Sequence, residues 1–234
     1  MRAATVARSV GAMEDATPSP SDAIELADWR RRIAELYADV RRIAARDPEA
    51  AWRRWREVRE RLYLEHPQSP VPAGSRSSFR FLAFPYDPAL RLSARLVPVP
   101  AAAAEVRPAA EAEAWPALPS SGPTAPPMRR LGTVELALPA GRASLSVFWL
   151  DEYAGGLFLP FRDATNGAET YGAGRYLLDT AKGADLGVDG NGDLVLDLNF
   201  AFQPSCAFDP RWACPLAPPE NRLSSRIEAG ERVA

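Results

Sequence analysis

The sequence predicts an α+β protein in which an N-terminal helical hairpin packs on an antiparallel β sandwich or a barrel-like sheet. Two observations carry this prediction. Apolar residues recur at the spacing of one helical face across residues 22–66. Short segments of alternating polar and apolar residues, separated by turns rich in Gly and Pro, then follow across residues 67–231. We expect these parts to form one domain.

The helical hairpin is expected over residues 22–66, after a disordered N-terminus at residues 1–21. Asp22 and Glu25 have the spacing of a capping box, in which the first residue caps the helix and the second reaches back to it. The Asp47–Pro48 pair is expected to end this helix and begin the next, because proline is tolerated at the first helical position.

The β-rich part is expected over residues 67–231, with an Ala- and Pro-rich loop at residues 98–127. Residues 133–138 and 144–149 alternate clearly and are separated by a short turn, which predicts a β-hairpin. The other expected strands are short and lie at residues 79–84, 91–97, 157–161, 174–179 and 194–200.

Composition argues against several classes of function. A formal net charge of −2 and a pI near 5.6 are not those of a general nucleic-acid-binding surface. No apolar run approaches the roughly 20 residues of a membrane-spanning helix, and the first residues lack the continuous apolar stretch of a signal peptide. We therefore expect a cytoplasmic protein with neither a nucleic-acid nor a membrane partner. His66 is the only histidine, which excludes a histidine-rich zinc site.

The densest group of polar residues lies between Pro160 and Glu231, among glycines and prolines that restrict the backbone. Packing alone does not require this pattern, which indicates a hydrogen-bonded interior or a binding site. Because a guanidinium matches a carboxylate or a phosphate, the leading hypothesis is a pocket for a small anionic ligand. The alternative is a buried ion pair between Arg175 and either Asp163 or Asp197. The candidate lining residues are Arg162, Asp163, Tyr171, Arg175, Asp197 and Asn199.

Two further hypotheses use other chemistry. In an enzyme, Asp163 or Asp197 would act as the acid or base, and Arg175 would hold the anion. A hard cation on these carboxylates and Asn199 is disfavoured, because the neighbouring arginines would repel it, so the sequence assigns no metal site and identifies no cofactor. In an interaction protein, the tryptophan-bearing N-terminal helices would dock a partner. Oligomeric state does not follow from the sequence.

Cys206 and Cys214 are the two cysteines of the chain and lie close together in a proline-rich segment. A disulfide between them would stabilise the fold by roughly 2–3 kcal/mol in the loop-entropy model. A reducing cytoplasm favours two buried thiols instead. A nucleophilic or redox thiol needs a nearby cation or helix N-terminus, and Arg211 is the nearest cation in the sequence.

Several stretches of the C-terminal half carry a resemblance to a known family. They read FRDATNGAETYGAGRYL, DLNFAFQPSCAF, CPLAPPENRL and IEAGE, and the HPQSP segment at residues 66–70 adds to them. Over roughly residues 50–231, the chain resembles a bacterial family known as domain of unknown function 1684. The resemblance implies one domain and marks certain polar positions, and it implies no activity, cofactor or catalytic residue.

Overall fold

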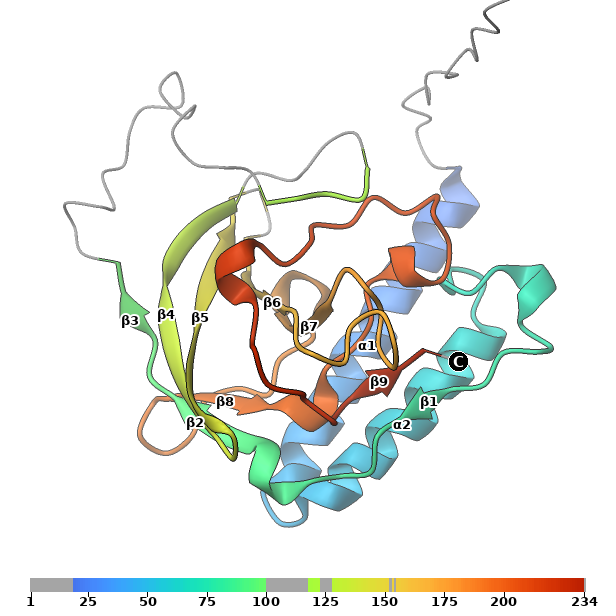
Figure 1. Cartoon of the computed structure of the whole chain (residues 1–234). Coiled ribbons are helices and arrows are strands. Elements are labelled where there is room, and N and C mark those ends of the chain that lie inside the picture. The colour runs from blue at the N-terminus through green and yellow to red at the C-terminus, as the bar shows by residue number, and fades with distance from the viewer. Residues whose placement is uncertain (1–18, 100–117, 123–127, 152, 154, 234) are drawn as a thin grey trace, which may run out of the picture.

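The computed structural model describes residues 19–99, 118–122, 128–151, 153 and 155–233. Two helices are followed by a mostly antiparallel β-sheet region, which confirms the predicted α+β class. Figure 1 shows the helices along one flank of the β-rich part, with the curved β4–β5 hairpin on another. The elements are α1 (Pro20–Ala44), α2 (Pro48–Glu65), β1 (Leu82–Ala83), β2 (Arg91–Ala94), β3 (Val97–Pro98), β4 (Met128–Leu138), β5 (Gly141–Leu150), β6 (Leu157–Phe161), β7 (Arg175–Asp179), β8 (Leu194–Asp197) and β9 (Glu231–Arg232).

Both helices begin with an N-cap and a proline, but α1 begins earlier than predicted. Its cap is Ser19, whose Oγ accepts a hydrogen bond from Asp22 N at 3.1 Å and donates one to the Asp22 carboxylate at 2.7 Å. The predicted pairing of Asp22 with Glu25 is therefore wrong. Helix α2 begins as predicted, with Asp47 accepting from Ala50 N at 2.8 Å. None of the helices that the structure describes is long and apolar enough to cross a membrane.

Most strands belong to a five-stranded antiparallel sheet with the linear order β3-β4-β5-β6-β7, which is open among the described residues. The predicted hairpin is β4–β5, whose register pairs Thr133 with Ser146. The ribbon β2–β8 and the C-terminal residues 223–229 pack against the inner face of this sheet. Leu136, Leu159, Leu196 and other apolar side chains fill the space between them. The arrangement therefore resembles a sandwich with one short, irregular layer.

The helices pack on the β-rich part through a second apolar core. Trp55 is fully buried, and its ring lies edge-on to Phe81 and Phe200 with centroids 5.9 and 5.5 Å away. Trp52 is also buried. These two tryptophans therefore hold α2 on the fold and are not available to dock a partner.

Three predicted segments differ from the structure. The strand expected at residues 91–97 is divided into β2 and β3, which belong to different sheets. Of residues 79–84, only Leu82–Ala83 form a strand. Strand β8 ends at Asp197, and Leu198–Phe200 form a 3-10 turn, so the strand expected at residues 194–200 is shorter than predicted. Residues 1–18, together with most of the expected loop at 98–127, lie outside the described residues.

Candidate functional site

Arg175 ties β7 to the C-terminal segment from inside the fold. Its side chain is fully buried, and Nη2 lies 3.2 Å from the Asp163 carboxylate. Nη2 also donates to Ile227 O at 3.0 Å, while Nη1 donates to the carbonyl oxygens of Ala229 and Glu231. Burial lowers the pKa of Arg175, although Asp163 opposes this shift. The protein itself therefore supplies four acceptors to this guanidinium.

Asp163 is enclosed in the same way, with a fully buried side chain. One carboxylate oxygen accepts hydrogen bonds from Thr165 Oγ1 at 2.8 Å, Ile227 N at 2.8 Å and Thr165 N at 3.2 Å. Its backbone N donates to Asn166 Oδ1 at 2.6 Å. The structure thus brings Arg175 and Asp163 together, as the ion-pair alternative expects, in a network with no opening for a ligand at these two side chains.

Asp197 and Asn199 form a separate buried cluster that holds the segment before β2. Asp197 accepts hydrogen bonds from Tyr86 OH and Arg91 Nη1, both at 3.2 Å. Asn199 brackets Asp87, accepting from its N at 2.9 Å and donating to its O at 2.8 Å. Burial raises the pKa of the Asp197 carboxyl. Both residues are 0% exposed, so a substrate in solution does not reach the Asp197 carboxyl.

Arg162 has a different environment from these four residues. It is half-buried and lines a cavity of about 240 Å³. Nη2 donates to Gly172 O at 2.7 Å, and the part of the chain that the structure describes gives Arg162 no carboxylate partner. We call this space the Arg162 cavity. Its lining residues are Pro119, Arg162, Ala173, Leu216, Ala217, Pro219 and Arg222.

Backbone pairing places a second arginine beside the first. Arg162 and Arg222 face one another in an isolated parallel β-bridge, with Arg162 N donating to Asn221 O at 2.9 Å and Leu223 N donating to Arg162 O at 2.8 Å. Buried Asn221 fixes this bridge, because its side chain hydrogen-bonds the backbone of Ser146 and the carbonyl of Pro160. Two cations therefore line one cavity, and none of its described lining residues is acidic.

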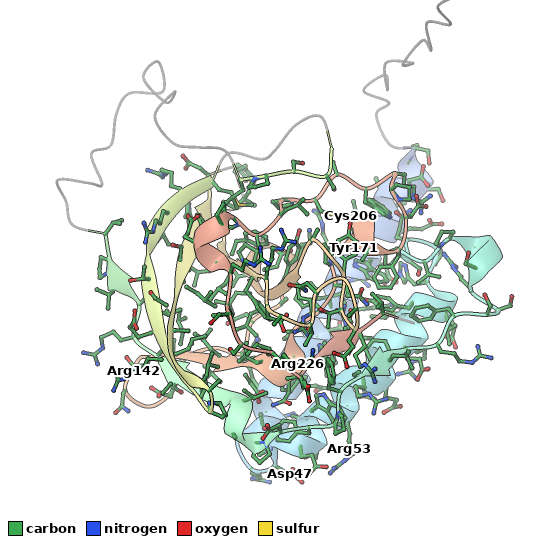
Figure 2. The ribbon with its side chains drawn as sticks, viewed as in Figure 1. Asp47, Arg53, Arg142, Tyr171, Cys206 and Arg226 are labelled. Atoms are coloured by element: carbon green, nitrogen blue, oxygen red, sulfur yellow. The ribbon has the colours of Figure 1, made fainter. Side chains whose placement is uncertain are left out.

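Tyr171 lies with the thiols and not with the buried arginine. Its hydroxyl hydrogen-bonds the Cys206 thiol, and Figure 2 shows the two residues in the same part of the molecule. Burial raises the pKa of Tyr171 to about 12, and Cys206 adds to the shift. Cys206 and Cys214 are free, buried and hydrogen-bonded to each other. Arg211, the cation expected beside them, is paired with Asp209 at 3.1 Å instead.

Sequence reasoning missed Arg222, because its pairing with Arg162 joins distant segments through a single backbone bridge. The one local signal was its place directly after Asn221, in the proline-rich stretch CPLAPPENRL. It also missed Ser121, which lies in the Ala- and Pro-rich loop and hydrogen-bonds the backbone of Cys214. Neither contact has a characteristic spacing in the sequence.

Comparisons with known proteins agree with this fold. A family model described as "Protein of unknown function (DUF1684)" matches residues 78–232, which include every residue lining the Arg162 cavity. No curated protein matches the chain. The solution NMR structure of an uncharacterized protein from Haloarcula marismortui is similar, with 28% identity and a TM-score of 0.54; the alignment covers 81% of this chain and 96% of that chain.

Proposed function

The chain belongs to the DUF1684 family, and we propose that it binds a small oxyanion, a carboxylate or a phosphate, between Arg162 and Arg222. The observation that supports this proposal is the β-bridge that sets the two arginines opposite each other at a cavity where no acidic residue lines the wall within the described part of the chain. Like charges directly opposite on neighbouring strands are destabilising, and a bound anion would relieve the repulsion.

The buried network behind the cavity supports a positioning role for Asp163. Successive residues of an extended segment project to opposite sides. Asp163 is held inside by Arg175, Thr165 and Ile227, so its neighbour Arg162 is directed outward to the cavity. In this proposal Arg162 alone of the candidate residues contacts the ligand, and buried Asp163 and Arg175 form the frame that orients it.

The cavity also limits the size and character of the ligand. Its volume of about 240 Å³ lies below the roughly 300–1,000 Å³ typical of sites for drug-sized molecules. Pro119, Leu216 and Pro219 add apolar side chains to its lining. A short monocarboxylate with a small apolar body suits this combination better than a nucleotide. We place this activity in the cytoplasm, consistent with two cysteines that are free thiols.

Isothermal titration of the purified chain with inorganic phosphate and with monocarboxylates from acetate to benzoate tests the proposal, and the matching amides serve as neutral controls. We expect at least one anion to bind, with affinity that falls as ionic strength rises. Arg162→Met and Arg222→Met should each weaken binding by about 10- to 100-fold, because a charge-assisted hydrogen bond is lost.

Arg142→Met is the matched control, since Arg142 is exposed near the start of β5, away from the labelled Tyr171 and Cys206 in Figure 2. It should bind like the unmodified protein. Thermal unfolding of each variant separates lost binding from lost fold. Equal affinity of the Arg162 variant and the unmodified chain would contradict the proposal, as would the absence of binding by every anion in the series.

A further inference from the structure

Cys206 and Cys214 lie in contact because the segment between them turns back on itself. Phe208 N donates to Ser205 O at 3.0 Å, and Trp212 N donates to Asp209 O at 3.2 Å. These turns return the chain so that the two thiols hydrogen-bond each other. The contact joins two side chains that are buried and free.

Ser121 fixes Cys214 in place from the neighbouring segment. Cys214 N donates to Ser121 Oγ at 2.9 Å, and Ser121 N donates to Cys214 O at 3.0 Å. The backbone around Cys214 is therefore held on both sides. The other thiol, Cys206, is in a single 3-10 turn, Ser205–Ala207. One sulfur is thus anchored, while the other sits on a short irregular element.

The hydrogen-bonding groups around the two sulfurs shift the pKa values of Cys206 and Cys214 in opposite directions. Cys206 has the Cys214 thiol, Ser121 and Tyr171 as hydrogen-bond partners, and these lower its pKa to about 6. The same hydrogen bond, together with burial, raises the pKa of Cys214 well above its usual value. The Tyr176 hydroxyl, which donates to Pro215 O, also lies beside Cys214. Lys182, whose Nζ lies 3.2 Å from the Asp179 carboxylate, is the cation whose charge acts on Cys214.

We propose that Cys206 and Cys214 form a dithiol site that exchanges with small-molecule disulfides, with Cys206 as the attacking thiol and Cys214 as the resolving thiol. The inference goes beyond anion binding and uses no residue that lines the Arg162 cavity. Tyr171 is the positioning residue, because it contacts Cys206 and is itself only half-buried. The contact between two unbonded sulfurs in one small cluster carries the proposal.

The exchange balances in two steps with a disulfide RSSR as the oxidant. The Cys206 thiolate attacks one sulfur of RSSR, which forms a mixed disulfide on Cys206 and releases RS⁻. Cys214 then attacks Cys206 Sγ, which forms the Cys206–Cys214 bond and releases the second RS group, while the Cys214 proton passes to the departing thiolate. The protein is oxidised by two electrons, and RSSR is reduced to one RSH and one RS⁻.

Intact mass measurement after incubation with bis(2-hydroxyethyl) disulfide tests the proposal on the native full chain. The probe is small and uncharged, so it does not report on the arginine pair. We expect the protein to lose the mass of two hydrogen atoms without retaining the probe, and dithiothreitol should reverse the change. Tryptophan fluorescence recorded in parallel shows whether the fold persists during the reaction.

Variants assign the two roles. Cys214→Ser keeps a hydrogen-bond donor but cannot resolve, so it should accumulate one probe adduct on Cys206. Cys206→Ser should react at least tenfold more slowly, because the remaining thiol is mostly protonated. Tyr171→Phe should move the midpoint of the pH–rate profile for Cys206 to higher pH, which a purely structural tyrosine would not do.

Three results would overturn the proposal. Two probe adducts on the unmodified protein would show that the thiols react independently. Reaction only after unfolding in urea would show that they are structural. Equal rates for Cys206→Ser and the unmodified chain would remove Cys206 as the attacking thiol. The first two use the unmodified chain alone, so they decide the matter even if a variant fails to fold.

Discussion

Replacing Arg175 with Met tests whether this arginine holds the fold or a ligand. Met retains much of the aliphatic volume but removes every hydrogen bond of the guanidinium. These bonds reach Asp163 and the carbonyl oxygens of Ile227, Ala229 and Glu231, all within the fold. The structure therefore predicts a large loss of stability in this variant.

The magnitude follows from what remains after the change. Removing one partner of a buried ion pair costs about 3–5 kcal/mol, because the other charge stays buried without compensation. Asp163 retains three donors, from Thr165 and Ile227, which lowers the cost, whereas the carbonyl oxygens left without a donor raise it. We expect a loss of about 3–5 kcal/mol in the free energy of unfolding, and a fall in Tm of roughly 6–20 °C for a chain of this size.

Urea unfolding followed by tryptophan fluorescence measures this loss, since Trp55 is fully buried. Arg162→Met is the matched variant and should lose only about 0.5–1.5 kcal/mol, the value of one hydrogen bond. Adding Asp163→Asn to Arg175→Met should recover part of the loss, because the stranded charge disappears. If Arg175→Met remained within about 1 kcal/mol of the unmodified chain, the description of Arg175 as a structural residue would be refuted.

Two other predictions concern the backbone and the helices. Gly230 has φ +76°, and a Cβ there would lie 2.3 Å from Ala201 O, so Gly230→Ala should destabilise the fold by about 2 kcal/mol or more in chemical unfolding. Gly74→Ala meets no atom within 4 Å and should instead stabilise by about 0.4–1 kcal/mol; the reverse order would contradict this account. The hydrogen bond from His66, 3.2 Å away, lowers the pKa of Asp28. The contribution of this pair to the free energy of unfolding should therefore be complete above the unfolded pKa of about 3.9, and it should be lost as pH falls through the lower folded pKa. Acid unfolding of Asp28→Asn should show a weaker dependence on pH in that window, and an unchanged profile would remove this pair from the explanation.

The parts of the fold that follow a local rule could be predicted from the sequence. The Asp47–Pro48 signal fixed the start of α2, and strict alternation located the β4–β5 hairpin. The first N-cap was missed because Ser19 and Asp22 both suit a cap, and the proline at position 20 decides between them. The sequence could not show where β8 ends, because Leu198 continues the apolar pattern while the chain already turns.

The candidate site was predictable as a region and not as a set of contacts. The C-terminal half contains both the polar residues of the buried network around Arg175 and those that line the Arg162 cavity. Composition does not distinguish one set from the other. Asp197 and Asn199 pair with the segment before β2, more than a hundred residues away in the chain. Such partners depend on how distant segments meet. No periodicity in the sequence records that arrangement.

The difference between a structural arginine and a binding arginine lies in which acceptors the fold already supplies. Arg175 and Arg162 each have a buried Nε without a hydrogen-bond partner, so this nitrogen does not distinguish them. Arg175, however, has a carboxylate and carbonyl oxygens around its other nitrogens, whereas Arg162 has one carbonyl oxygen and a second arginine opposite it. A charge that the fold neutralises contributes to stability, and a charge that it leaves uncompensated at a cavity is available to a ligand. For this reason the same residue type, in the same polar stretch, is assigned two roles.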